Sequence, residues 1–223
     1  MQGDPKMEET TACALASRYA VLAVGSNACP ARLADQDKFG GHPAVVIPVL
    51  RGFVEGLVSV YAPRMADYGS VPSTVMVLQG ATSELWLTRL SEEELFRMDK
   101  SEGRGSTYDL VELPDCRFHM NGGVTISPIS EYYQPEALRH PGTETPILLD
   151  CFRVTGATLT SMGQEDGGRL VDRITRGFTD REQPHIHPIR DHSLRTQLPG
   201  SACTLERRSA PSRYSVLNET ESP

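Results

Sequence analysis

The apolar residues of the N-terminal half fall into short continuous runs that Gly and Pro separate. The run at 19–24 reads Tyr-Ala-Val-Leu-Ala-Val and stops at Gly25, and such a run indicates a buried strand. Because similar runs recur at close spacing, the pattern favours a mostly antiparallel sheet or barrel over a βαβ arrangement. Further strands are predicted at 44–50, 54–61, 73–78, 84–88, 108–113, 123–129 and 147–155.

The clearest helix signal begins at Ser91. Ser91 is a favourable N-cap, and Glu94 three residues later completes a capping box. Leu90 and Leu95 occupy the two positions of a hydrophobic staple. These local signals predict a helix that ends at Gly103.

The same helix carries an unexpected acidic residue. Leu95, Met98 and Glu102 stand three and four residues apart, so they share one face if the helix runs that far. A carboxylate is thereby placed on the apolar stripe at the helix end, where a leucine would be ordinary. The alternative is that the helix frays after Asp99 and leaves Glu102 in water.

The rest of the chain divides into a domain and two flanking segments. A short helix is expected after Pro30, and a second helix at 169–176. Residues 1–18 are predicted to form a flexible N-terminal arm, and residues 19–180 the domain. Residues 181–223 contain several prolines and few apolar residues, which predicts an extended polar tail.

Composition and charge narrow the functional classes. The chain is 39% hydrophobic and 23% charged with a net charge of −7, which is typical of a soluble domain and argues against nucleic acid as the main partner. No apolar run approaches the roughly 18 residues of a membrane span. The five cysteines are scattered without CxxC pairs, which favours reduced thiols and a cytoplasmic location.

A small polar loop follows the first predicted strand. Gly25-Ser26-Asn27 places several backbone amides at a strand end, where glycine allows close approach and the amides can bind an anion. Ser-Asn turns are common, so the loop alone is weak evidence. Together with an inward-facing Glu102, it becomes a candidate site.

Three segments resemble the γ-glutamylcyclotransferase-like family, which shares its fold with the AIG2-like group. The segment 23–28, followed by Pro30, resembles the family's Tyr-Gly-Ser-Asn-Leu opening, and 72–78 resembles its Ala-Thr strand. The segment 90–103, followed by Tyr108, resembles its Leu-Asp-x-x-Glu-Gly…Tyr pattern. The order and spacing agree over residues 19–113.

The resemblance implies an α+β fold: a small mixed or antiparallel β-barrel flanked by helices, with one pocket at its end. It also implies an enzyme that cleaves a γ-glutamyl amine, or a related small amide, by intramolecular cyclisation to 5-oxoproline, without a metal or cofactor. Glu102 would be the general acid and base. The substrate-binding residues would be Val24, Gly25, Ser26, Asn27, Ala28 and Tyr108.

Two departures from the family pattern support an alternative. Val24 stands where the family has tyrosine, and Ala28 where it has leucine. A non-catalytic small-molecule-binding or scaffold protein of the same fold is therefore the second hypothesis. The expected partner is a small molecule rather than nucleic acid or a membrane, and a homodimer is left open. Tyr108 has a simpler interpretation as a packed strand aromatic.

Two other candidate sites are weaker. His185-x-His187 could bind a metal, but alternate positions on an extended tail do not form a preorganised ligand set. Cys29 lies two residues beyond the loop, but a thiol nucleophile needs a histidine partner that the sequence does not place beside it. We therefore expect no metal site.

Overall fold

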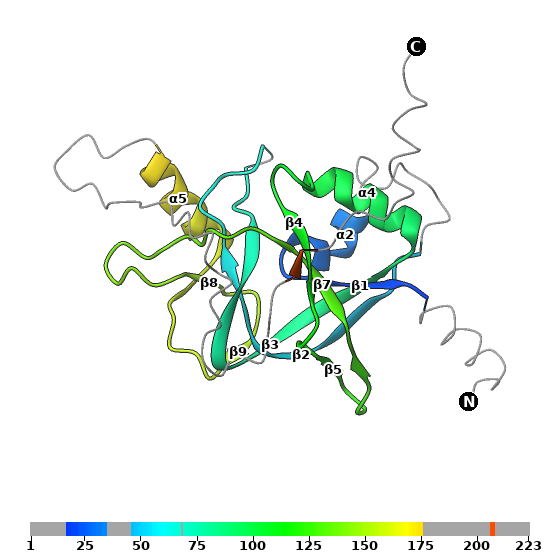
Figure 1. The fold of residues 1–223 in the computed structure, drawn as a ribbon. Helices are drawn as coiled ribbons and strands as arrows, with labels where there is room; N and C mark the ends of the chain where they lie inside the picture. The colour runs from blue at the N-terminus through cyan, green and yellow to red at the C-terminus, as the bar shows by residue number, and fades with distance from the viewer. Residues whose placement is uncertain (1–16, 35–45, 68, 176–205, 208–223) are drawn as a thin grey trace, which may run out of the picture.

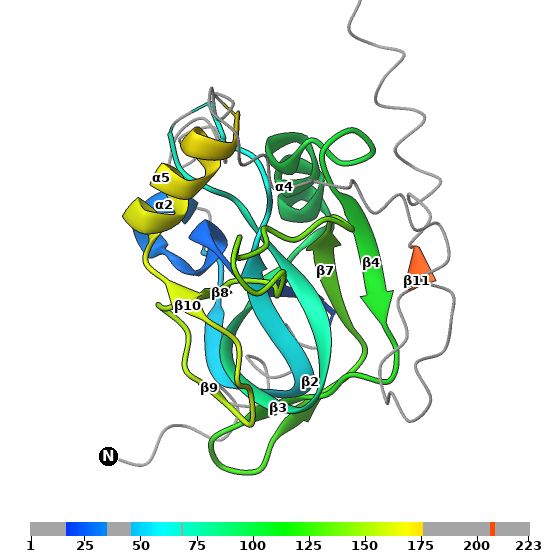
Figure 2. The ribbon, with the colours of Figure 1, turned by 90° about the vertical axis from the view of Figure 1, so that its left-hand side faces the viewer.

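The computed structural model describes residues 17–34, 46–67, 69–175 and 206–207. Within these ranges the chain forms one mixed sheet with few helices, which confirms the α+β part of the predicted fold class. The α-helices of the described residues lie toward one end of the sheet, and β5 (Phe118–Met120) lies at the other end (Figures 1 and 2). The division into arm, domain and tail stays a prediction.

The sheet is built around one long hairpin. β2 (Val49–Tyr61) and β3 (Ser73–Leu90) pair antiparallel along almost their full lengths. Between the pairs Glu55–Thr82 and Leu57–Val77 the register shifts by three residues, and Gly56 there has a φ of 75°, a conformation that suits glycine. The predicted breaks after residues 50 and 78 are wrong, because β2 stays paired with β3 through 51–53 and β3 continues through the irregularity at 78–81.

β1 (Tyr19–Ala23) lies in the interior of the sheet. It pairs antiparallel with β3 and parallel with β7 (Ile129–Tyr133). β7 in turn pairs antiparallel with β4 (Asp109–Leu113). Four of the five β1 residues are buried, which explains the continuous apolar run in the sequence.

The remaining strands are short. The predicted strand at 123–129 is replaced by β6 (Thr125–Ile126) and β7, and that at 147–155 by β8 (Leu148–Leu149) and β9 (Val154–Thr155). The main strand path is open, running from β10 (Ser161–Met162) at one end to β11 (Glu206–Arg207) at the other. The predicted barrel is therefore not confirmed.

The helices follow the predictions with one change of boundary. α2 (Pro30–Leu33) has Pro30 at its start, and α4 (Glu92–Glu102) is the helix predicted after Ser91. α5 (Gln164–Thr175) begins earlier than the predicted Arg169. Its Leu170 and Val171 pack in a buried cluster with Tyr61.

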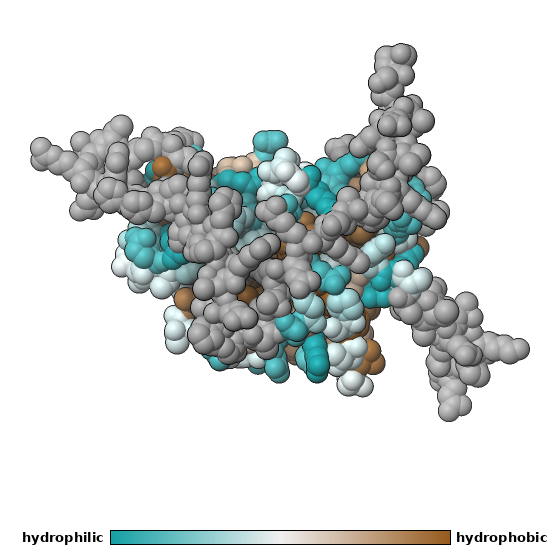
Figure 3. Space-filling model, in the orientation of Figure 1, coloured by the Kyte–Doolittle hydropathy of each residue, from teal (hydrophilic) through white to brown (hydrophobic). Residues whose placement is uncertain are grey.

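Most large apolar side chains of the described residues are at least partly buried. Among the described residues, the exposed large hydrophobic side chains are Val46, Met65 and Val124. The described atoms in Figure 3 are mostly hydrophilic or intermediate, with small hydrophobic areas between them. In the described part of the chain, no helix has both the length and the apolar character to cross a bilayer.

The cysteines do not all match the prediction. Cys29 and Cys151 are free thiols, as expected. Cys116 is disulfide-bonded, so the prediction of reduced thiols is wrong for this residue.

Candidate active site

Local capping interactions fix the helix that carries Glu102. The Ser91 side chain accepts a hydrogen bond from the Glu94 amide at 3.3 Å, and the Glu94 carboxylate accepts one from the Ser91 amide at 2.7 Å. At the other end, Gly103 adopts the left-handed conformation with a φ of 61°, and its amide donates to the carbonyls of Asp99 and Lys100. Because these caps define α4 through its last residue, the helix does not fray before Glu102.

A buried polar network attaches the end of α4 to the sheet. The Tyr132 hydroxyl on β7 donates to Asp99 Oδ1 at 2.7 Å. Arg104, just beyond the helix, donates to Asp99 Oδ2 at 2.7 Å. The network holds the turn that carries Glu102 against β7.

The Gly25-Ser26-Asn27 loop follows β1 directly and contains a short 3₁₀ turn at Ser26–Ala28. A Cβ atom on Gly25 would lie 2.1 Å from Ser73 Oγ, so a side chain there would displace Ser73. The Ser73 hydroxyl is the end of a short flexible side chain and would have to rotate away from such a Cβ. Glycine thus lets the loop lie close to β3.

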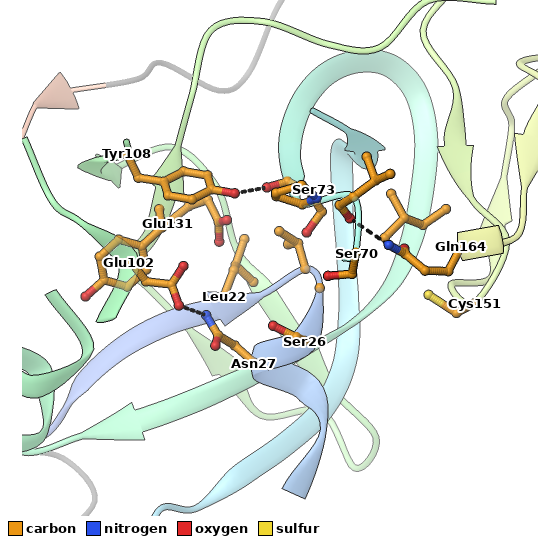
Figure 4. Close-up of a pocket in the computed structure, with 16 residues that line it drawn as sticks. Leu22, Ser26, Asn27, Ser70, Ser73, Glu102, Tyr108, Glu131, Cys151 and Gln164 are labelled. Atoms are coloured by element: carbon orange, nitrogen blue, oxygen red, sulfur yellow. Dashed lines mark hydrogen bonds between the residues drawn. The ribbon is translucent and has the colours of Figure 1, made fainter. Parts of the chain in front are cut away.

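The loop and Glu102 line one cavity of about 340 Å³, a size that suits a small molecule. The end of β1, the loop, residues 70–73, the end of α4, Tyr108 and β7 form most of the wall. Leu149, Cys151 and Gln164 close the far side. Figure 4 shows the carboxyl groups of Glu102 and Glu131 turned toward this hollow.

Hydrogen bonds join segments that are distant in sequence across this cavity. Asn27 Nδ2 donates to Glu102 Oε1 at 3.3 Å, and the Tyr108 hydroxyl donates to the Ser73 carbonyl at 3.1 Å (Figure 4). Arg64 lies over the Tyr108 ring, with its guanidinium carbon 5.3 Å from the ring centre. The cavity wall is thus held by one contact between the loop and α4 and another between Tyr108 and β3.

The structure brings together most of the residues predicted for the site. The cavity is lined by Val24, Gly25, Ser26, Asn27, Glu102 and Tyr108. Ala28 is not part of the lining, and its amide donates to the Gly25 carbonyl within the turn. Tyr108 also packs in a buried cluster with Leu110 and Tyr132, so the packing interpretation holds as well.

Of the two alternative sites, the described structure places the one at Cys29. Cys29 is exposed and is not part of the lining. His185 and His187, the candidate metal ligands, lie outside the described residues.

Sequence reasoning missed Glu131, the second carboxyl of the cavity. Glu131 lies in the middle of β7 and is only 2% exposed. Its neighbours two residues away, Ile129 and Tyr133, belong to the main hydrophobic core. The alternation of this glutamate with two apolar residues indicates that its side chain points to the core. The predicted strand ended at residue 129, so this pattern was not recognised.

The two carboxyls influence the titration of neighbouring groups. Burial raises the pKa of Glu131 well above the ordinary value, and the charge of Glu102 raises it further. Burial likewise raises the pKa of Tyr108 to about 12, although Arg64 opposes this and the two carboxyls add to it. Glu131 is therefore held in its protonated form over a range where an exposed glutamate is ionised.

We expect the free energy of unfolding of Glu131→Gln to increase relative to that of the wild type as pH rises above about 4.5, the ordinary pKa of glutamate. In that range the folded protein holds a proton on Glu131 that the unfolded chain releases, so its free energy of unfolding falls with pH, by at most about 1.4 kcal/mol per pH unit. Glutamine has no such proton. Urea denaturation of both proteins at several pH values measures the difference.

The matched control is Glu136→Gln, since Glu136 is an exposed carboxyl and its curve should run parallel to the wild type. Two titratable groups interact electrostatically with Glu131: Glu102 on α4 and Tyr108. The Tyr108 ring in turn contacts Arg64. A Glu131→Gln variant that loses stability relative to the wild type as pH rises would contradict the burial of a protonated acid.

Among known proteins, this chain is similar to some solved structures. No family model matches the chain, and no curated protein matches it. One similar structure is a "Gamma-glutamyl cyclotransferase", with a TM-score of 0.43 and 13% identity over 53% of this chain and 67% of that chain. Another is the "uncharacterized protein loc79017 from Homo sapiens", with a TM-score of 0.42 and 12% identity over 70% of this chain and 99% of that chain.

At these TM-scores and identities the likeness carries no information on activity or substrate. The solved structures that are similar to this chain thus include a gamma-glutamyl cyclotransferase, from the family that the three sequence segments resemble.

Proposed function

We propose that this chain binds a γ-glutamyl amine, or a related small amide, and cleaves it by intramolecular cyclisation to 5-oxoproline. The substrate's own α-amine attacks its γ-carbonyl carbon, closes a five-membered lactam and expels the amine. Attack within one molecule benefits from proximity, so the protein mainly orients the chain and moves protons. The reaction needs no metal or redox cofactor.

One observation carries this proposal. Glu102 and the Gly25-Ser26-Asn27 loop, 75 residues apart in sequence, line the same cavity and are joined by the Asn27–Glu102 hydrogen bond. The loop at the end of β1 would bind the substrate carboxylate. Glu102 would take a proton from the α-ammonium group.

Binding is tested by thermal shift with γ-glutamyl dipeptides and 5-oxoproline, with α-glutamyl dipeptides as the matched control. We expect stabilisation by the first two ligands, because ligand binding to the folded state raises its stability. A response equal to that of the α-glutamyl controls, or none, would remove the support for a γ-glutamyl site.

The second candidate function is a non-catalytic small-molecule-binding protein of the same fold. The observation that favours it is Val24, which lines the cavity where the family pattern has tyrosine. A specific thermal shift without any turnover of the bound γ-glutamyl compound would identify this alternative.

Closure of the sheet into a barrel is also proposed. β4 and β5 are consecutive in the chain and pair with β7 and β6 respectively. β7 also reaches β1, whereas β5 reaches β2 on the other side of β3. The hairpin formed by β4–β5 and β6–β7 thus pairs with β1 at one end and with β2 at the other. Pairing at both ends would close a ring of strands below the cavity.

A further inference from the structure

Glu131 is an acidic residue that packing alone does not explain. It is buried at 2% exposure on the core-facing side of β7, an interior strand between β1 and β4. Among the described residues, its Oε2 atom has no hydrogen-bond partner. Burying such a polar atom without a partner costs free energy, so an unsatisfied group of this kind requires an explanation.

The unsatisfied carboxyl belongs to the wall of the candidate active site. Glu131 lines the cavity together with Glu102, Asn27 and Tyr108, and its carboxyl group is turned into the hollow (Figure 4). A bound molecule in the cavity would therefore meet two carboxyl groups, one from α4 and one from β7.

The two carboxyls have different surroundings. Glu102 is half-buried at a helix end and accepts a hydrogen bond from Asn27. Glu131 is fully buried within the sheet, and burial together with the Glu102 charge raises its pKa. Two carboxyl groups in one site whose environments differ in this way commonly divide the acid and base roles between them.

We propose that Glu131 is a second catalytic residue of this cavity, the general acid that protonates the leaving nitrogen while Glu102 acts as the general base. The proposal rests on the function proposed above and deepens it, because it assigns the two proton transfers to two different groups. It also implies substrates whose leaving groups are basic amines, since those must be protonated in order to leave.

The proton transfers balance over one turnover. The substrate α-ammonium gives one proton to the Glu102 carboxylate, and the free amine attacks the γ-carbonyl carbon to form the new C–N bond. When the tetrahedral intermediate collapses, the old C–N bond breaks and Glu131 protonates the departing nitrogen. The Glu131 carboxylate then takes the second proton of the ring nitrogen. The released amine takes the proton held by Glu102, which returns both carboxyls to their starting states.

The test compares two leaving groups in the wild type, Glu102→Gln and Glu131→Gln. One substrate is a γ-glutamyl alkylamide, whose leaving amine requires a proton, and the other is γ-glutamyl-p-nitroanilide, whose weakly basic aniline does not. We expect Glu131→Gln to lower kcat by about 10²–10⁴-fold on the alkylamide but by less than about tenfold on the anilide, because the acid is then dispensable. Glu102→Gln should impair both substrates, since both require a free α-amine.

Three results would overturn the assignment. Equal losses on both substrates in Glu131→Gln would indicate a positioning role, and no loss on either would make Glu131 a bystander. A wild type that releases no 5-oxoproline from either substrate would overturn the proposed function and the assignment together, which distinguishes that failure from the first two.

Two further variants control for folding. Glu136→Gln, which changes an exposed carboxyl on the segment after β7, should behave as the wild type on both substrates. Glu131→Asp keeps the acid but shortens its reach, so we expect a smaller loss than in Glu131→Gln with the same dependence on the leaving group. If Glu131→Gln does not fold, a loss in Glu131→Asp that is equal on the two substrates overturns the assignment.

Discussion

Glu102→Gln is expected to reduce the rate of 5-oxoproline formation by about 10²–10⁴-fold, the usual contribution of a general acid–base group. Glutamine preserves the shape of the side chain and can still accept the hydrogen bond from Asn27, but it cannot take the proton of the α-ammonium group. Steady-state kinetics with a γ-glutamyl amine should show the loss mainly in kcat.

The matched control is Glu93→Gln on the same helix, because the Glu93 side chain is 75% exposed and forms an ion pair with Arg97 one turn away. Its activity should equal that of the wild type. The free energy of unfolding of both variants should equal that of the wild type to within about 0.5 kcal/mol, as expected for changes outside the core. Undiminished turnover in Glu102→Gln would end the assignment of Glu102.

Asp99→Ala is expected to have the largest effect on stability, a loss of about 3 kcal/mol. Asp99 is buried and accepts hydrogen bonds from Tyr132 and Arg104. Removing one partner of a buried charge pair costs about 3–5 kcal/mol, and the lower end applies because both side chains retain some exposure. Urea denaturation followed by circular dichroism measures the free energy of unfolding.

Comparison variants separate charge from packing at Asp99. Glu93→Ala breaks an exposed pair on the same helix and should cost less than about 0.5 kcal/mol. Asp99→Asn retains an acceptor for one of the two donors and should lie between Asp99→Ala and the wild type. A loss in Asp99→Ala no greater than that in Glu93→Ala would show that the network does not secure the end of α4.

Local signals in the sequence predicted the helix that carries the candidate acid. Ser91 and Glu94 specify a capping box that depends on residues three positions apart, and the structure contains both of its hydrogen bonds. Gly103 ends the helix in the left-handed conformation. These features could be predicted because each is decided by neighbours in the chain.

The parts that were missed depend on distant residues. β2 continues through 51–53 and β3 through 79–83, because pairing between the two strands rather than local preference keeps the chain extended. The position of β7 is set by its parallel pairing with β1, more than 100 residues earlier in the chain. Since the extent of β7 was unknown from sequence, the inward orientation of Glu131 was unknown as well.

Most of the candidate site could be predicted because its motifs lie in the N-terminal half, within the segment that resembles a known family. The proximity of Asn27 to Glu102 followed from that resemblance rather than from local physics. The far wall at Leu149, Cys151 and Gln164 has no such motif. Its position follows from the folding of the later segments over residues 70–73, as in the Gln164 hydrogen bond to the Val71 carbonyl at 3.1 Å.

The central claim is that this cavity directs a substrate amine onto its own γ-carbonyl carbon, and the products of a single incubation test it most directly. The wild-type protein is incubated with a γ-glutamyl amine, and the products are identified by mass spectrometry. The account predicts 5-oxoproline and the free amine in equal amounts, both formed about 10²–10⁴-fold more slowly in a parallel incubation with Glu102→Gln. Release of glutamate instead would mean that water is the nucleophile, and an unchanged substrate would mean that the cavity does not perform this reaction.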